Sequence, residues 1–233
     1  MEIDGKVVVI TGGASGIGEA LTYKLKESGA KVAIADINFQ ALTRVSTNAN
    51  CLGLISDVTD QKQVSSLINN VEKKLGPIDL FISNAGVCLG EGTHAASASN
   101  EVWNLLWKIH VMSHVYAART LLPRMIKRKN GYFLQIISAA ALLSQVGDAA
   151  YSATKQAALA FAESMAISHK DDHIRVSVVC PQYVATEMLG YSGNDNIKPP
   201  KHVLTPNKVA ESVLYGLKNE RFLILPHEEV EKY

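Results

Sequence analysis

Short apolar runs alternate along the chain with longer segments in which apolar residues recur at helical spacing. Residues 7–11 form an unbroken β-branched run, and residues 17–28 have a helical period that closes at Gly29. This pattern predicts a strand followed by a helix. Further strands are predicted at residues 31–35, 51–56, 79–83, 132–138, 175–180 and 222–225. Further helices are predicted at residues 60–75, 101–128, 150–170 and 206–218.

The predicted strands are apolar on both faces, which is typical of a parallel sheet that helices cover on both sides. Right-handed crossovers build such strand and helix units into a doubly wound sheet. We therefore predict an α/β fold with a single domain over residues 1–233, about seven strands and helices on both faces. Residues 187–205 are too long and too polar for an ordinary connection, and we predict that they form a substrate loop or lid.

Composition excludes several classes of function. The chain has 23 basic and 22 acidic residues, and its formal net charge of +1 creates no field that would gather nucleic-acid phosphates or anionic lipids. No stretch approaches the roughly 18 consecutive apolar residues of a membrane span. The first ten residues leave no room for a signal peptide, and three cysteines without a CxxC pairing fit a reducing compartment. We therefore expect a cytoplasmic protein that neither binds nucleic acid nor inserts into a membrane.

A glycine-rich turn joins the first predicted strand to the first predicted helix. Residues 11–18 read Thr-Gly-Gly-Ala-Ser-Gly-Ile-Gly, and such a turn leaves backbone N–H groups and a positive helix end free to hold a pyrophosphate. Asp36 closes the second strand, where a carboxylate can accept hydrogen bonds from the adenosine ribose. Asp57 follows the third strand and could meet the adenine edge. Each of these features also has a purely structural reading, as a loop, a helix cap or a turn residue.

A tyrosine and a lysine, Tyr151 and Lys155, lie four residues apart in a predicted helix and therefore share one face. The pKa of a phenol, about 10, must fall by roughly three units for proton exchange near neutrality, and a nearby ammonium pushes it in that direction. Ser138, at the end of the preceding strand, could present its hydroxyl to a substrate oxygen beside the tyrosine. By itself this spacing is also typical of a surface tyrosine packed over a lysine stem, but the glycine-rich turn favours the catalytic interpretation.

With these motifs, the sequence resembles the short-chain dehydrogenase/reductase family over residues 5–225. The family's T-G-x-x-x-G-x-G turn corresponds to residues 11–18, its N-A-G to residues 84–86, and its serine and Y-x-x-x-K to the three residues just described. The resemblance implies a Rossmann-like fold and an oxidoreductase that transfers a hydride between a nicotinamide cofactor and an alcohol or carbonyl substrate. A non-catalytic dinucleotide-binding sensor or regulatory protein on the same fold is the alternative.

The resemblance also implies a set of cofactor contacts. In the family the lysine holds the nicotinamide ribose, and Thr186 corresponds to a threonine that contacts the carboxamide. The predicted cofactor-binding residues are Gly12, Ser15, Gly16, Ile17, Gly18, Asp36, Asp57, Val58, Asn84, Ala85, Gly86, Tyr151, Lys155, Pro181, Val184 and Thr186. We expect NAD rather than NADP, because Asp36 would repel a 2′-phosphate and its sequence neighbours supply no compensating cation.

Two positions depart from the family pattern. Gln182 stands where a glycine usually follows Pro181, which puts a side chain beside the expected nicotinamide. His110 stands on the long central helix where the family commonly has an asparagine that holds a water of a proton relay. We include His110 among the catalytic candidates and keep a buried, hydrogen-bonded histidine as the alternative. His114 lies four residues further on, but no glutamate follows His110 as in an HExxH motif, and we predict no metal site.

Apolar side chains in the sequence predict both the class of substrate and the oligomeric state. The family's layout surrounds the substrate with Val87, Leu89, Ala139, Leu142, Leu143, Val146, Tyr183, Met188 and Leu189. These residues predict a medium-sized apolar secondary alcohol or ketone, since no arginine is present to clamp an anion. Four polar residues could instead bind a hydroxylated ligand: Glu91, His94, Gln145 and Gln182. The helix after Tyr151 is apolar nearly all round, and we therefore expect a homodimer, or else a homotetramer.

Overall fold

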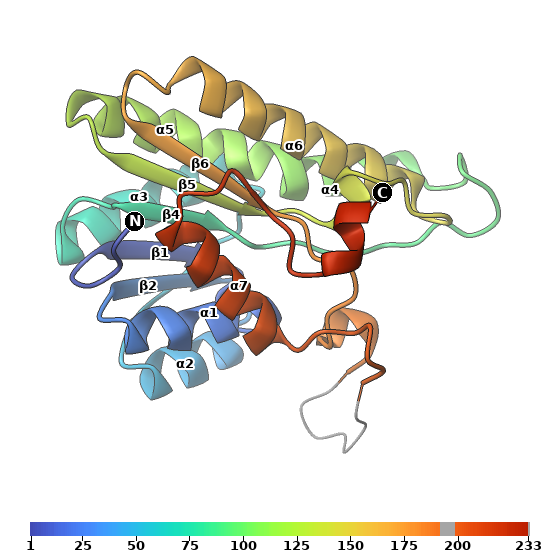
Figure 1. The fold of residues 1–233 in the computed structure, drawn as a ribbon, viewed down its shortest axis with the longest axis horizontal. Helices are drawn as coiled ribbons and strands as arrows, with labels where there is room; N and C mark the ends of the chain where they lie inside the picture. The colour runs from blue at the N-terminus through green and yellow to red at the C-terminus, as the bar shows by residue number, and fades with distance from the viewer. Residues whose placement is uncertain (192–198, 233) are drawn as a thin grey trace.

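The computed structural model describes residues 1–191 and 199–232. Its strands form one parallel sheet in the order β3-β2-β1-β4-β5-β6-β7 (Figure 1). The strands are β1 (Val7–Thr11), β2 (Lys31–Asp36), β3 (Leu52–Ile55), β4 (Leu80–Ser83), β5 (Gly131–Ile136), β6 (Ile174–Val179) and β7 (Leu223–Ile224). The α-helices are α1 (Gly16–Glu27), α2 (Phe39–Asn48), α3 (Gln61–Leu75), α4 (Asn100–Trp107), α5 (Ser113–Lys127), α6 (Ala149–Ser168) and α7 (Pro206–Lys218). The predicted Rossmann-like, doubly wound α/β fold is confirmed.

The sheet separates two apolar cores. Along β1, Val7 and Val9 pack on one side, and Val8 and Ile10 pack on the other, because successive side chains of a strand point to opposite faces. Helices α3, α5 and α6 cover the first side, and α1, α2 and α7 cover the second (Figure 1). Burial of both faces explains why the central strands are unbroken apolar runs in the sequence. Within the described ranges, no helix has the length and apolar character that crossing a bilayer requires.

The strand order reverses between β1 and β4. The chain runs outward from β1 through β2 to β3, and then crosses to the other side of β1 and continues from β4. The connections that leave the carboxyl ends of β1 and β4 therefore diverge, which opens a crevice between them. The glycine-rich turn after β1 and residues 84–86 after β4 meet at this crevice.

Two helical regions differ from the prediction. The pattern does not predict α2, because Leu42 and Val45 are its only buried residues and its other positions are largely polar. The single helix expected at residues 101–128 is divided into α4, a π-helical turn at Lys108–Met112, and α5. Apolar periodicity is nearly the same across the three parts, and therefore it does not reveal the extra residue that a π-helical turn inserts.

Two parts of the segment expected to form a lid have regular structure. Glu187–Leu189 form a 3₁₀ turn, and Leu204 pairs with Val184 in a parallel bridge. Residues 192–198 of this expected lid lie outside the described residues.

Candidate active site

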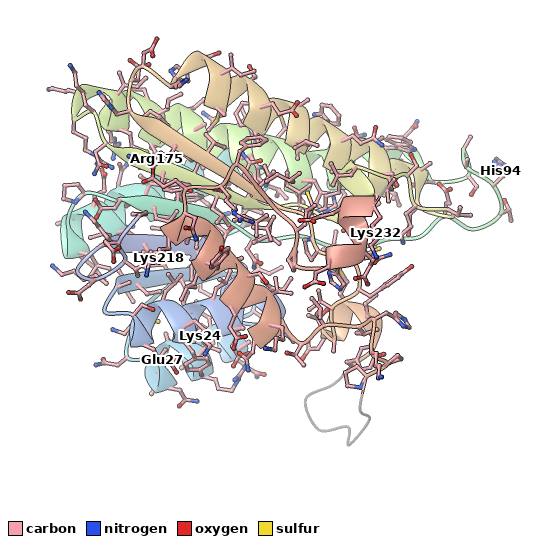
Figure 2. All side chains as sticks on the ribbon, in the orientation of Figure 1. Lys24, Glu27, His94, Arg175, Lys218 and Lys232 are labelled. Atoms are coloured by element: carbon pink, nitrogen blue, oxygen red, sulfur yellow. The ribbon has the colours of Figure 1, made fainter. Side chains whose placement is uncertain are left out.

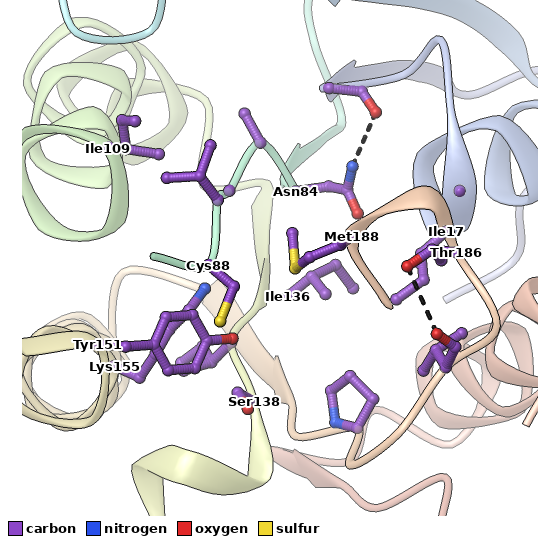
Figure 3. Close-up of a pocket in the computed structure, with 18 of the residues that line it drawn as sticks. Ile17, Asn84, Cys88, Ile109, Ile136, Ser138, Tyr151, Lys155, Thr186 and Met188 are labelled. Atoms are coloured by element: carbon purple, nitrogen blue, oxygen red, sulfur yellow. Dashed lines mark hydrogen bonds between the residues drawn. The ribbon is translucent and has the colours of Figure 1, made fainter. Parts of the chain in front are cut away.

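A cavity of about 740 Å³ opens at the carboxyl ends of the strands. Every predicted cofactor-binding residue except Gly18 lines this cavity, and Ser138 lines it as well. Tyr151, Lys155 and Ser138 gather at one end of the cavity, and Thr186 lies across from them (Figure 3). The fold therefore brings the glycine-rich turn and the Y-x-x-x-K residues, which are far apart in the sequence, into one site.

The turn after β1 is shaped by glycines whose side-chain space is already occupied. Gly12 has a φ of +61°, and a Cβ at this position would lie 2.9 Å from the Cα of Ala85. Gly16 has a φ of +52°, and its Cβ would lie 3.1 Å from Cγ2 of Thr186. Gly18 does not line the cavity; a Cβ there would come within 2.0 Å of the Gly12 carbonyl oxygen, so this glycine lets α1 pack against the turn. The cavity thus reaches the backbone N–H groups at the start of α1.

Asn84 joins the ends of β1 and β4. Its Nδ2 donates to the carbonyl oxygens of Thr11, at 3.0 Å, and of Gly12, at 2.9 Å. Figure 3 draws one of these two bonds. The hydroxyl of Thr11 accepts hydrogen bonds from the backbone N–H groups of Asn84, at 3.0 Å, and Ala85, at 3.3 Å. Asn84 lines the cavity, and its side-chain amide donates to the glycine-rich turn, so it holds that turn in place.

The acidic residues at the ends of β2 and β3 are held by backbone hydrogen bonds. Asp36 accepts from the N–H of Ala14, at 3.2 Å, and from the N–H of Asn38, at 3.0 Å. Asp57 accepts from the N–H of Thr59, at 2.8 Å, which is the turn geometry considered as its alternative role. Between them lies Ser56, whose buried hydroxyl oxygen has no hydrogen-bond partner among the described residues. All three line the same end of the cavity, so this end carries unused hydrogen-bonding capacity.

Tyr151 and Lys155 are both buried at the opposite end, where Nζ of the lysine lies 5.4 Å from the centre of the tyrosine ring. Burial raises the pKa of Tyr151 to about 12, although a hydrogen bond with Ser138 opposes the rise. Burial lowers the pKa of Lys155 to about 8. The expected lowering of the tyrosine pKa by the lysine is therefore not found in this structure, because loss of hydration outweighs the attraction between the two groups.

His110 lies behind the cavity in the π-helical turn and does not line it. Its Nδ1 is 3.0 Å from the Thr154 hydroxyl, and its Nε2 accepts a hydrogen bond from the N–H of Val87 at 3.4 Å. Because the Thr154 hydroxyl donates to the carbonyl of Tyr151, it accepts the proton on Nδ1. Burial lowers the pKa of His110 to about 2. The ring is therefore neutral with both nitrogens occupied, which matches the alternative of a buried, hydrogen-bonded histidine.

The same ring packs edge-on against Tyr151, with the two ring centres 5.3 Å apart. His114, one turn further along the chain, is also buried and donates from Nδ1 to Oε1 of Gln135 at 2.8 Å. His110 and His114 therefore form hydrogen bonds with different residues.

The four polar residues that could bind a hydroxylated substrate separate into two pairs. Gln145 and Gln182 line the cavity, whereas Glu91 and His94 line a second hollow of about 640 Å³ on the far side of residues 144–146, which Gln145 lines as well. His94 lies at the tip of a loop that projects from the body of the protein (Figure 2). Among the residues that the structure describes, the cavity lining includes no arginine.

Sequence reasoning missed two side chains close to Tyr151. Cys88 lines the cavity, and its Sγ lies 4.0 Å from Oδ2 of Asp148. Asp148 is buried directly before α6; Gln145 donates to its Oδ2, and its Oδ1 has no hydrogen-bond partner in the described parts of the chain. Burial raises the pKa of both the thiol and the carboxyl. An aspartate immediately before a predicted helix is the signal that could have drawn attention to Asp148.

Comparison with known proteins agrees with this geometry. The family model for short-chain dehydrogenases matches residues 6–196. A 1-deoxy-11-beta-hydroxypentalenate dehydrogenase of Streptomyces exfoliatus is 33% identical over 242 residues, which cover 98% of this chain and 86% of that protein. A meso-2,3-butanediol dehydrogenase of Serratia marcescens is 32% identical over 191 residues, covering 81% of this chain and 75% of that protein.

Among solved structures, a short-chain dehydrogenase/reductase of Burkholderia phymatum in complex with NAD superposes with a TM-score of 0.89. It is 25% identical, and the match covers 100% of this chain and 92% of that chain. With the strand order, the glycine-rich turn and the placement of Ser138, Tyr151 and Lys155 in one cavity, these matches show that the chain belongs to the short-chain dehydrogenase/reductase family of oxidoreductases.

Proposed function

We propose that the protein transfers a hydride between NAD and a medium-sized apolar secondary alcohol or its ketone. The observation that carries this proposal is the shared cavity, in which Tyr151, Lys155 and Ser138 face the glycine-rich turn. Relatives that act as dehydrogenases of hydroxypentalenate and butanediol support an alcohol or ketone as the substrate. The convergence of the three polar side chains on one end of the cavity argues against a non-catalytic sensor, which would not need them.

The residues present fit a dinucleotide. A Cβ at Gly12 or Gly16 would press against Ala85 or Thr186, so glycines let the turn close around the start of α1, and the hydroxyl of the N-cap residue Ser15 forms no capping hydrogen bond there. At the other end of the crevice, the carboxylate of Asp36 and the unpartnered hydroxyl of Ser56 can bind an adenosine group. NAD, when bound, supplies the hydride acceptor or donor.

The proton step belongs to Tyr151: in oxidation its deprotonated oxygen takes the proton of the alcohol, and in reduction its hydroxyl gives a proton to the carbonyl oxygen. Ser138 orients that oxygen by a hydrogen bond. Lys155, which lies over the tyrosine ring, holds the cofactor ribose and stabilises negative charge on the tyrosine oxygen. His110 holds helix α6 against residues 86–88 through Thr154 and Val87, and so it positions Tyr151 rather than exchanging a proton itself.

A preference for NAD over NADP rests on charge at the end of β2. Asp36 would repel a 2′-phosphate. Arg44 in α2 is a cation close to this carboxylate, since both contact Ala14. It is paired with both carboxylate oxygens of Glu19, at 2.6 and 2.9 Å. Its charge is therefore already compensated.

The substrate proposal rests on the lining of the cavity near Tyr151. Apolar side chains dominate this region, and its polar lining residues include Ser144, Gln145, Gln182 and Glu187. Absorbance at 340 nm would follow NAD reduction over a panel of alcohols of matched size. We expect higher kcat/KM for apolar secondary alcohols than for polyols or hydroxy acids. The reverse order would refute the substrate class, and no reduction with any alcohol or ketone would refute the reaction.

We also propose that the protein is a homodimer, or a homotetramer, and that it acts as one domain in the cytoplasm. Leu105 and Trp107 in α4 and Ile167 in α6 are large apolar residues that stay exposed in the single chain. Pairing of these helices across a two-fold axis would cover them. A monomeric mass by light scattering at micromolar concentration would contradict the assembly.

A further inference from the structure

One wall of the cavity is a peptide segment that follows β6. Pro181, Gln182 and Tyr183 all line the cavity. The Pro181 carbonyl accepts a hydrogen bond from the N–H of Ala139, next to Ser138, at 2.8 Å. The direction of the Gln182 and Tyr183 side chains therefore depends on how the following two peptides are held.

These two peptides are held by a histidine from the C-terminal segment. Nδ1 of His227 accepts from the N–H of Gln182 at 3.2 Å, and its Nε2 is 3.0 Å from the carbonyl oxygen of Tyr183. Since Nδ1 accepts, the ring proton lies on Nε2 and is donated to that carbonyl. The ring is 2% exposed. The His227 ring therefore bridges two consecutive residues, Gln182 and Tyr183, accepting from one and donating to the other. They lie 45 and 44 positions away in the chain.

The sheet explains why this contact is possible. Strand β7 pairs in parallel with β6, and therefore the chain leaves both strands at the same edge of the sheet. After β7 the chain reaches His227 and then a short 3₁₀ helix at Glu228–Lys232, in which Val230 is buried (Figure 1). The C-terminal segment is therefore packed behind the cavity wall and not free in solvent.

We infer that His227, which lies outside the catalytic set, is a positioning residue that holds the wall formed by Gln182 and Tyr183 and thereby strengthens NAD binding. This inference rests on the proposed function, because the wall adjoins the place where the nicotinamide would lie. The two backbone groups are partly buried, and losing their partner costs free energy, so removal of the ring favours a movement of the wall. His227 touches neither the substrate nor the reacting atoms; it acts through the backbone of its two neighbours.

The test replaces His227 by Phe, which keeps a flat ring and removes both hydrogen bonds. We expect the Kd for NAD, measured by calorimetric titration, to rise about tenfold, as the loss of two neutral hydrogen bonds would allow. Hydrogen exchange followed by mass spectrometry should show faster exchange at residues 182–186 and unchanged exchange in β1. His227→Gln, which retains an amide donor and acceptor, should recover part of both effects.

The matched control is Val230→Ala, which removes buried apolar atoms from the same segment and leaves both hydrogen bonds of His227 in place. It should lower the melting temperature while leaving the Kd for NAD and the exchange at residues 182–186 unchanged. The inference fails if His227→Phe binds NAD like the wild type with the same exchange, or if Val230→Ala weakens NAD binding equally. If His227→Phe does not fold, His227→Gln takes its place. Weaker NAD binding and faster exchange at residues 182–186 in His227→Gln, but not in Val230→Ala, would then support the inference, and wild-type behaviour of His227→Gln would refute it. Absence of NAD binding by the wild type would refute the proposed cofactor, and the exchange measurement would still test the contact.

Discussion

Replacing Asp36 by Asn should reduce the preference for NAD over NADP. The carboxylate is held by two backbone N–H groups, at 3.2 and 3.0 Å, so it cannot easily swing away from an added phosphate. A unit charge about 5 Å from a phosphate costs on the order of 3 kcal/mol at an effective dielectric constant near 20, and partial exposure of this side chain reduces that cost to about 1–2 kcal/mol. Asn keeps one acceptor oxygen for the backbone and removes the charge.

We therefore expect the Kd for NADP to fall about tenfold in Asp36→Asn. The Kd for NAD should rise about tenfold at most, because hydrogen bonds from the ribose to a charged acceptor are worth roughly 1.5–3 kcal/mol and a neutral oxygen retains part of this. Calorimetric titration of both cofactors at fixed ionic strength measures the ratio directly. Asp60→Asn is a matched control, since this residue caps α3 away from the cavity. An unchanged ratio in Asp36→Asn, or equal binding of the two cofactors by the wild type, would refute the reasoning from charge.

Three further predictions concern the turn, the histidine and the lysine. Gly12→Ala should abolish NAD binding in calorimetry, because its Cβ would meet the Ala85 backbone at a positive φ, whereas Gly92→Ala, which meets nothing within 4 Å, should bind normally. His110→Phe should destabilise the protein to urea by about 1–3 kcal/mol through unpaired buried groups and lower kcat; a His110-dependent titration in the pH–rate profile between pH 5 and 8 would contradict its neutral, positioning role. Because the pKa of Lys155 falls from 10.5 to about 8 on folding, its unfolded form binds more protons between these values, and Lys155 contributes a rise with pH of up to about 3 kcal/mol to the free energy of unfolding. The raised pKa values of Cys51, Cys180 and Tyr151 contribute a fall over the same range. The free energy of unfolding of the wild type minus that of Lys155→Met, from urea titrations, should therefore rise with pH, and a constant difference would assign the titration to another group.

The sequence predicts the sheet well because physical constraints on its strands are local. Strands buried on both faces must be apolar throughout, and the turns between them carry glycine and aspartate at positions that the backbone conformation requires. Helix α2 escapes prediction because it is short and includes the weak helix formers Thr43, Val45, Ser46, Thr47 and Asn48. The π-helical turn around His110 escapes prediction because the apolar period continues through it almost unchanged.

Motif spacing predicts the catalytic candidates, but it does not predict their electrostatics. The pKa of Tyr151 depends on burial and on Cys88 and Asp148, which reach it only through the fold. His227 cannot be identified from the sequence either, because its partners lie more than forty residues away and offer only backbone atoms. A side chain that contacts backbone atoms far away in the chain produces no recognisable pattern in the sequence.

The role of Tyr151 as the proton-transfer residue is tested most directly by Tyr151→Phe. This change removes the hydroxyl and keeps the ring that packs against His110. With NAD and the best alcohol of the panel, initial rates at 340 nm should fall by roughly 10² to 10⁴, the range for loss of general acid–base catalysis, while the Kd for NAD stays within about twofold of the wild type. A folded Tyr151→Phe protein that turns over the same alcohol at a rate near that of the wild type would contradict the account.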